Sequence, residues 1–355
     1  MIKPEPLNWS LVIATYRREA ILPRCLQLAA QQTVPPTEII VVDASPNWET
    51  TQTRIMQDVA PQYPAIDWKY VQAKRTSLTS QRNQGIDLAG SDILFLIDDD
   101  SFMYPDCAEE VMQVYSQDIT HQVVGIMPRW EALPPDRLSN SSKPPSSNFS
   151  KTIKAFQFRL TELVSQLFTY HVPSYDFPRP KHTLPETITQ LAIEPVPNLL
   201  GFAMTFRREL FEQIRFEEML EAYSASEDID ISYRAIRRGI LLRASKARIY
   251  HMQAPGGRLS RVTVAALKAF NTAALHCLYN SDLNRFKKMY PQLLWERLIK
   301  VTFRDILTGR LSLPSTRGVW FAFRHYQEIF SKNPDELRTW YPKFQREIIT
   351  HLNKP

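Results

Sequence analysis

Three consecutive carboxylates, Asp98, Asp99 and Asp100, follow directly after the apolar run Phe95–Ile97. Like charges this close repel one another, and a hard divalent cation that prefers oxygen ligands would relieve the repulsion. Mg²⁺ or Mn²⁺ takes one or two carboxylates in such a site and fills its other positions with water and substrate phosphate oxygens. An N-cap for a helix beginning near Pro105 would need only one Asp, so the triplet favours a metal site.

A second acidic cluster, Glu227-Asp228-Ile229-Asp230, opens a predicted helix at 228–238. Acidic side chains in a first helical turn are stabilised by the helix dipole, which is one sufficient reason for them. In the functional interpretation, one carboxylate is a general base that takes the proton from an attacking hydroxyl. The spacing alone leaves both interpretations open.

Polar side chains also follow the two earlier strands that the sequence predicts. Thr15-Tyr16-Arg17 comes after the first strand, and Asp43 ends the second. Ligands of open α/β sheets bind outside the carboxyl ends of the strands, close to the point where strand order reverses. Three polar clusters at one edge therefore predict a ligand site there.

The elements that position these clusters alternate between strand and helix. Strands are predicted at 10–14, 38–43, 66–71 and 92–97, helices at 20–31, 49–59 and 78–89, and later elements at 199–206, 226–238 and 240–250. Ile39–Val42 is a continuous β-branched run, typical of a strand covered on both faces, and Gly90 stands where a helix C-cap is expected. The order predicts an α/β fold with a mostly parallel, doubly wound sheet and helices on both faces.

The regular pattern lapses after Pro128. A loop rich in Pro, Ser and Asn is predicted at 133–150, followed by an amphipathic helix at 151–170. The final hundred residues are predicted to form basic, aromatic-bearing helices. We expect one catalytic domain at 1–255, with halves at 1–130 and 131–255, and a basic helical region at 256–355.

Composition limits the class of protein. The 355 residues are 44% hydrophobic, which excludes general disorder, and three isolated cysteines argue against a disulfide framework or structural zinc. The sequence has neither a signal-peptide core nor a run of 18 apolar residues, so we expect a cytoplasmic protein without a spanning helix. From His251 onward there are 17 Lys and Arg against 7 Asp and Glu. Such a basic region suits an anionic membrane, nucleic acid, a diphosphate substrate or simple solvation.

Taken together, the motifs resemble the family 2 glycosyltransferases, whose GT-A fold joins a Rossmann-like nucleotide-binding half to an acceptor-binding half. The resemblance covers roughly residues 9–251 and rests on motifs in the family's order: Ser10–Arg17, Gln32-Thr33 with Pro35-Pro36 before Glu38–Asp43, Gln81–Gly85, Asp98–Asp100 as the DxD motif, Phe202–Arg208, Glu227-Asp228 as the ED motif, and Tyr250-His251. The stretch 128–197 matches no motif of the family, so the identity of the acceptor is left open.

The resemblance implies a role for each matched residue. Asp43 would accept a hydrogen bond from a ring N–H of the base. The residues that would bind the nucleotide sugar are Thr15, Tyr16, Arg17, Asp43, Arg75, Arg82, Asp98 and Asp99. Asp100 would coordinate Mn²⁺ or Mg²⁺ and His251 would be a further metal ligand, although a lone His after a strand is also common as a structural residue. Within the Glu227-Asp228 pair, Asp228 would be the catalytic base.

The activity so implied is metal-dependent transfer of a sugar from a nucleoside-diphosphate sugar to an acceptor hydroxyl, with inversion, in polysaccharide or glycoconjugate synthesis. The acceptor would be a saccharide or a lipid-linked molecule, and basic residues of the loop 256–261 would close over the phosphates. Helices near 293–310 and 317–330 would contact an anionic membrane, making the protein peripheral there, or else pack on the catalytic domain.

Three rivals remain. One is a protein of the same fold that binds a nucleotide sugar without turnover. Another is a nucleotidyltransferase, which usually has a glycine-rich segment after the first strand, whereas Ala14–Arg18 has no glycine. The last is nucleic-acid binding by the basic tail, which we do not expect; it would predict salt-sensitive binding that is independent of the catalytic carboxylates.

Overall fold

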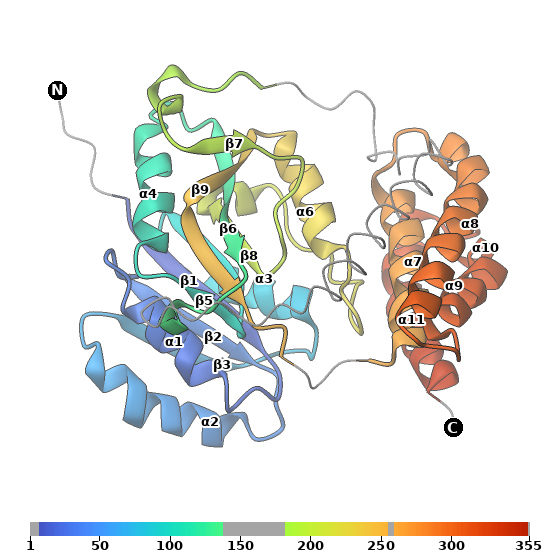
Figure 1. Cartoon of the computed structure of the whole chain (residues 1–355), viewed down its shortest axis with the longest axis horizontal. Helices are drawn as coiled ribbons and strands as arrows, with labels where there is room; N and C mark the ends of the chain where they lie inside the picture. The colour runs from blue at the N-terminus through green and yellow to red at the C-terminus, as the bar shows by residue number, and fades with distance from the viewer. Residues whose placement is uncertain (1–6, 138–181, 255–258, 354–355) are drawn as a thin grey trace. The chain divides into compact units, whose positions relative to one another are not determined.

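The computed structural model describes residues 7–137, 182–254 and 259–353. The chain divides into two compact units, one formed by residues 1–140 and 180–257 and the other by 141–179 and 258–355. Figure 1 shows the strands in the first unit and a group of long helices in the second. The predicted amphipathic helix at 151–170, most of the predicted loop at 133–150 and the glycines of the predicted 256–261 loop lie outside the described residues.

The first unit is built on one nine-stranded sheet, in the order β3-β2-β1-β4-β8-β6-β9-β5, with β7 also paired to β9. Its strands are β1 (Trp9–Thr15), β2 (Glu38–Asp43), β3 (Asp67–Gln72), β4 (Ile93–Asp98), β5 (Ser101–Met103), β6 (Val123–Glu131), β7 (Ile193–Pro195), β8 (Ala203–Arg207) and β9 (Ile240–His251). Its helices are α1 (Leu22–Ala30), α2 (Trp48–Arg54), α3 (Leu78–Leu88), α4 (Cys107–Gln117) and α6 (Glu227–Ile236).

The sheet is parallel from β3 to β4 and mixed beyond it. β8 runs antiparallel to both β4 and β6, and the short β5 runs antiparallel to β9. The parallel register places Thr15 beside Asp43 and Ala14 beside Asp98. Three strand-end polar groups therefore meet at one edge, as predicted.

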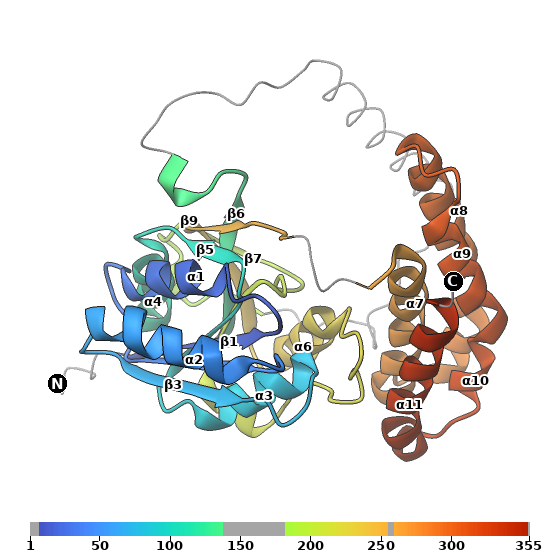
Figure 2. The ribbon, with the colours of Figure 1, turned by 90° about the horizontal axis from the view of Figure 1, so that it is seen from below.

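Both faces of the sheet are buried because successive strand residues point to opposite sides. Leu11 and Ile13 pack with α1 and α4 in one core, whereas Val12 packs with α3 and α6 in the other. Figure 2 shows α1 and α4 separated from α3 and α6 by the strands. The predicted doubly wound α/β architecture is confirmed.

Details of the predicted elements needed correction. β5, β6 and β7 had not been predicted, and the second predicted helix is α2 followed by a single π-helical turn at Ile55–Val59. The predicted cap at Gly90 is wrong: α3 ends on the extended Ala89, and the Gly90 N–H donates instead to Glu38 Oε1 at 2.5 Å. All three cysteines are buried free thiols.

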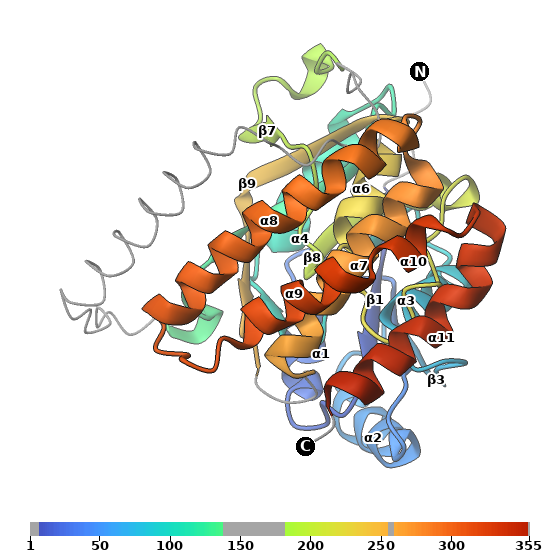
Figure 3. The ribbon, with the colours of Figure 1, turned by 90° about the vertical axis from the view of Figure 1, so that its right-hand side faces the viewer.

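The second unit is helical, as predicted for the end of the chain. It contains α7 (Arg261–Tyr279), α8 (Leu283–Leu307), α9 (Pro314–His325), α10 (Gln327–Phe330) and α11 (Pro334–Leu352), which Figure 3 shows from one side. Polar caps begin three of them: the side chains of Ser260, Asp282 and Asn333 each accept a backbone N–H three residues later. Among the described residues, no helix combines the length and apolar character needed to cross a membrane.

Candidate active site

Two carboxylates and an imidazole meet at the edge of the sheet. Asp98 ends β4, Asp100 lies two residues later, and His251 ends β9, which pairs with β5 so that Ser101 lies beside His251. His251 Nε2 lies 3.1 Å from Asp100 Oδ1 and 3.9 Å from Asp98 Oδ2. One ligand atom from each of the three residues lies within 4.8 Å of the other two. Two carboxylates and an imidazole fit a divalent cation that accepts both oxygen and nitrogen ligands, such as Mn²⁺, and the carboxylates alone would suit Mg²⁺.

Hydrogen bonds and ring stacking hold this cluster in place. Asp100 Oδ2 accepts the Ala254 N–H at 2.8 Å, and the His251 ring stacks on Phe202 with centroids 4.4 Å apart. Burial is the largest influence on the pKa of Asp100 and would raise it, but the hydrogen bonds from His251 and the Ala254 N–H outweigh burial and lower it. Asp100 is therefore ionised and oriented. The sequence analysis assigned Asp98 to the sugar nucleotide, whereas the geometry groups it with the candidate metal ligands.

Asp99, between these two ligands, points elsewhere. Its Oδ2 accepts the Thr15 hydroxyl at 2.7 Å, which ties the end of β1 to the acidic triplet. Burial is the largest cause that raises the pKa of Asp99, to about 7; the Thr15 hydrogen bond opposes the rise, and the charges of Asp98 and Asp100 contribute to it. The structure thus separates the three aspartates into two that face His251 and one that faces Thr15.

Arg82, on α3, connects the acidic triplet to the second acidic cluster. Its Nη2 donates to Asp98 Oδ1 at 3.1 Å and to the Gly201 carbonyl at 2.6 Å, and its Nη1 donates to Glu227 Oε1 at 3.1 Å. The side chain is 2% exposed, and its guanidinium lies 5.4 Å from the Phe216 ring centroid. The sequence analysis expected Arg82 to bind the nucleotide sugar and did not predict that it links Asp98 to Glu227.

Glu227 and Asp228 begin α6 in different environments. Burial, together with the charge of Asp228, raises the pKa of Glu227 to about 8, although Arg82 acts to lower it. Asp228 is less buried; its Oδ2 accepts the Gly201 N–H at 3.2 Å and its Oδ1 accepts the Ile229 N–H at 2.9 Å. Asp228 is therefore the better placed of the two to receive a proton from a substrate.

Gly201 was missed as a site residue. A Cβ built there would lie 2.9 Å from Glu227 Oε1 and 3.3 Å from Asp228 Cβ, so any side chain would crowd the acidic pair. The signal available in the sequence was its rarity, because the chain has only nine glycines, and its place directly before the motif at Phe202.

Thr15 and Asp43, which the resemblance assigns to the nucleotide, lie beside each other at the ends of β1 and β2. Both carboxylate oxygens of Asp43 accept hydrogen bonds, from the Ser45 N–H at 2.7 Å and from the Tyr70 hydroxyl at 2.6 Å. Gln81 Nε2 donates to the carbonyls of Thr15 and Val42, at 2.9 and 2.8 Å, so α3 is fastened to the ends of both strands.

The remaining predicted residues are more exposed. Arg17 has a positive φ of 54°, its N–H donates to Ser45 Oγ at 2.7 Å, and its guanidinium lies 5.1 Å from the Tyr16 ring centroid. Arg75 forms an ion pair with Glu218 at 3.4 Å, and its side chain is 58% exposed. The structure therefore places Arg17 and Tyr16 directly after the Thr15 strand end, and engages Arg75 with an acidic partner.

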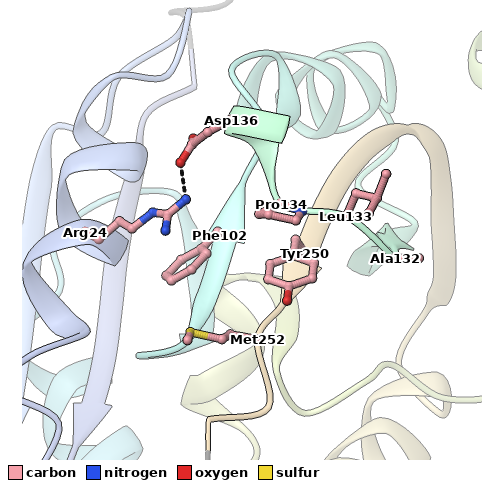
Figure 4. Close-up of a pocket in the computed structure, with 8 residues that line it drawn as sticks. All are labelled: Arg24, Phe102, Ala132, Leu133, Pro134, Asp136, Tyr250 and Met252. Carbon is pink, nitrogen blue, oxygen red and sulfur yellow. Dashed lines mark hydrogen bonds and ion pairs between the residues drawn. The ribbon is translucent and has the colours of Figure 1, made fainter. Parts of the chain in front are cut away.

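A separate cavity of about 430 Å³ lies on the other side of the β5–β9 pair (Figure 4). Phe102 and Tyr250 line it, with ring centroids 6.1 Å apart, because they alternate with Ser101 and His251 along the two strands. Arg24 lies over the Phe102 ring and forms an ion pair with Asp136. The β5–β9 pair thus carries the carboxylate–imidazole cluster on one side and this cavity on the other.

Comparison with known proteins gives a family match that covers most of the first unit. Residues 6–256 match the model of the family described as glycosyltransferase like family 2. The chain is 31% identical over 111 residues to the putative glycosyltransferase EpsH of Bacillus subtilis (strain 168), covering 29% of each chain. It is 27% identical over 108 residues to an uncharacterized glycosyltransferase of Haemophilus influenzae, covering 30% of this chain and 34% of that one. The matched segment thus spans about a third of each relative's length.

Two solved structures that were compared with this chain have little sequence identity to it. GalNAc-T7, crystallised with UDP, GalNAc and Mn²⁺, is 15% identical, with a TM-score of 0.52 covering 99% of this chain and 59% of that one. Staphylococcus aureus TarS 1–349 in complex with UDP is 16% identical, with a TM-score of 0.43 covering 94% and 92%. At 15% identity, the likeness to GalNAc-T7 concerns the fold alone.

Proposed function

The chain belongs to the glycosyltransferase like family 2 and has a GT-A fold, and we propose that it transfers a sugar from a nucleoside-diphosphate sugar to an acceptor hydroxyl, inverting the anomeric carbon. The observation that carries the proposal is the link through Arg82. One buried guanidinium connects Asp98, in the candidate metal cluster, to Glu227, the neighbour of the candidate base. Groups suited to hold a diphosphate and to take a proton are therefore built into one rigid arrangement.

In this proposal, Asp98, Asp100 and His251 hold the cation, which when bound neutralises the negative charge that develops on the leaving diphosphate. Their donor atoms lie close enough together to share one ion. The hydrogen bond from Ala254 and the Phe202 ring fix two of the three side chains before any ligand arrives. Preorganised ligands of this kind lose little conformational entropy when they bind.

Asp228 is the proposed base. Backbone N–H groups of Gly201 and Ile229 orient its carboxylate, and the side chain is open enough to meet an acceptor hydroxyl. Glu227 is held against Arg82 in a buried position and supports the geometry of the pair. A single displacement, with the acceptor attacking opposite the diphosphate, turns an α-linked donor into a β-linked product.

Thr15, Tyr16, Arg17 and Asp43 form the proposed nucleotide side of the site, with Arg75 at its periphery. The acceptor class that we propose is a saccharide or lipid-linked molecule, with a role in polysaccharide or glycoconjugate synthesis. Because the similarly folded GalNAc-T7 was crystallised with UDP and Mn²⁺, this pair is the natural first probe.

A thermal-shift series with UDP, GDP and dTDP, each with and without Mn²⁺, tests donor binding. A ligand that binds only the folded chain stabilises it by about 2.7 kcal/mol at a hundredfold excess over its Kd. We expect one nucleotide to raise the Tm only with Mn²⁺, and we expect Asp100→Asn to abolish that rise. Asp58→Asn, at an exposed position of the same unit, is the matched control and should behave like the wild type.

Turnover is tested by incubating the chain with sugar nucleotides and Mn²⁺ and measuring release of the free diphosphate. Release that Asp228→Asn suppresses supports transferase activity. Nucleotide binding with no release from any donor, in the presence of varied saccharide acceptors, would instead indicate a binding protein without turnover. A nucleotide response in Asp100→Asn equal to that of the wild type would contradict the proposed metal site.

A further inference from the structure

Large apolar side chains are exposed on α8, on α9 and on the loop between them. We call this surface the α8–α9 face and define it by five residues with their exposed fractions: Trp295 (47%), Phe303 (44%), Ile306 (50%), Leu311 (83%) and Trp320 (44%). Scattered single apolar residues are normal on protein surfaces, whereas a contiguous group indicates a binding surface.

The members of this face lie on one side of the two helices. Trp295, Phe303 and Ile306 are separated by eight and three residues, which brings them to the same side of α8. The Trp295 ring lies 6.2 Å from that of Trp320 and 5.2 Å from that of Phe323, so the side chains of α8 and α9 join directly. Figure 3 shows the two helices side by side, and Leu311 lies in the loop that connects them.

The exposed charged side chains of α8, α9 and the loop between them are all basic. Residues 283–325 contain nine Lys and Arg and only two acidic residues, Glu296 and Asp305. Both are buried, at 8% and 0% exposed. Glu296 forms an ion pair with Lys300, and Asp305 Oδ2 accepts the Ser315 N–H at 2.7 Å, where it caps α9. Within these described helices, therefore, every exposed charged side chain is basic.

We propose that the α8–α9 face binds the surface of an anionic lipid bilayer. The tryptophans would lie at headgroup level, Phe303, Ile306 and Leu311 would enter the acyl boundary, and exposed basic residues such as Lys288 and Arg317 would contact the lipid phosphates. No helix among the described residues can span the bilayer, so the contact is peripheral.

Charge selects the bilayer over the other candidates. A second copy of the chain, paired through the same face, would bring like charges together, which opposes association. Nucleic acid would satisfy the basic residues but would leave a face dominated by aliphatic and indole groups without an apolar partner. An anionic bilayer satisfies both components, because it offers phosphates above a hydrocarbon interior.

Vesicle flotation of the full chain tests the proposal. Vesicles of phosphatidylcholine with about 30% phosphatidylglycerol should carry the chain at low salt, and pure phosphatidylcholine vesicles should not, because screening and loss of lipid charge both weaken the attraction. Ile306→Ser combined with Leu311→Ser should weaken binding by about tenfold or more, since apolar burial contributes in proportion to area. Ile119→Ser removes an apolar side chain of 68% exposure from the first unit and should not change binding.

A second pair of variants tests the electrostatic part. Lys288→Glu with Arg317→Glu should weaken binding to anionic vesicles several-fold. Lys343→Glu, which reverses a 72% exposed charge on α11 of the same unit, should leave binding within about twofold of the wild type because it lies outside the proposed face. Circular dichroism melts check that all variants are folded, and Mn²⁺-dependent nucleotide binding should be unchanged in all of them.

Three results would overturn the proposal. One is failure of the wild type to float with anionic vesicles at low salt. The second is equal flotation of the Ile306→Ser, Leu311→Ser variant and the wild type. The third is a wild-type dimer that this variant converts to a monomer without any vesicle binding, since the face would then be an interface between copies. None depends on sugar transfer, so the proposed function stands or falls separately.

Discussion

Arg82 and Glu227 are joined by a buried hydrogen bond of 3.1 Å between Nη1 and Oε1, although 145 residues separate them. The same guanidinium also holds Asp98 and the Gly201 carbonyl. The start of α6 and the end of β4 are therefore kept at a fixed separation. This contact makes the proposed base and the proposed metal cluster parts of one structure.

Replacing Arg82 by Ala should destabilise the first unit by about 3–5 kcal/mol, because buried carboxylates lose their cationic partner. Urea unfolding followed by circular dichroism measures the change. Arg208→Gln, at an exposed position of the same unit, should cost less than about 0.5 kcal/mol. A loss in Arg82→Ala as small as in this control would show that the buried contact contributes little.

Asp228→Asn should lower kcat roughly 100- to 10,000-fold, because the amide cannot accept the acceptor's proton. The KM for the donor should change little, since the cation ligands are untouched. Steady-state release of nucleoside diphosphate, measured over a range of donor concentrations, separates the two parameters. A donor KM that rises with kcat unchanged would assign Asp228 to binding instead.

Gly201→Ala should lower the rate of transfer at least about tenfold while costing about 1–3 kcal/mol of stability, because the added methyl group overpacks the acidic pair. Gly90→Ala is the matched control: its Cβ would meet Glu38 Oε1 at an ordinary 3.6 Å. Kinetics and urea unfolding of both variants provide the comparison. Equal behaviour of the two would mean that Glu227 and Asp228 tolerate a side chain at position 201.

Glu38 gives the stability of the first unit a dependence on pH. Burial, the largest influence, would raise the pKa of Glu38, but hydrogen bonds from Lys69, Ser10 and the Gly90 N–H lower it from 4.5 to about 2. The unfolded chain thus binds this proton more readily. The stabilisation, up to about 3 kcal/mol, is complete above the unfolded pKa and is lost as the pH falls through the folded one.

The free-energy difference between the wild type and Glu38→Gln should therefore shrink between about pH 5 and pH 2. Chemical denaturation across this range measures it. Glu212→Gln, at an exposed position, is the control and should differ from the wild type by a small amount that does not vary with pH. A wild-type advantage that stays constant down to pH 2 would contradict the lowered pKa.

The sequence predicted those strands whose pattern of apolar and polar residues is visible within a single segment of the chain. β2 has the predicted bounds because Ile39–Val42 is buried on both faces and bounded by polar residues. β5 has only three residues, too few to show a period, and its pairing with β9 joins Ser101 to His251 across 150 positions. β8 was placed as an element, but its antiparallel direction arises from the route of the chain and leaves no local signal.

The same distinction applies to the candidate site. The aspartate triplet and the Glu227-Asp228 pair are recognisable as acidic clusters in the sequence. The residues that surround them in the folded chain could not be predicted from it. The link through Arg82 requires α3, Gly201 and α6 to meet in space, and the different partners of Asp99 and Asp100 arise in the turn between β4 and β5. Contacts between segments that are distant in the sequence therefore could not be predicted from motifs and periodicity.

The place of β9 in the sheet bears on how the protein is made. β9 lies between β6 and β5 and supplies His251 at its end. A nascent chain that has left the ribosome only as far as β8 already carries all three aspartates, but its sheet still lacks an interior strand. The imidazole joins Asp98 and Asp100 only when that strand is inserted. Competence to bind the ion would thus be acquired only after β9 has left the ribosome and paired with β6 and β5.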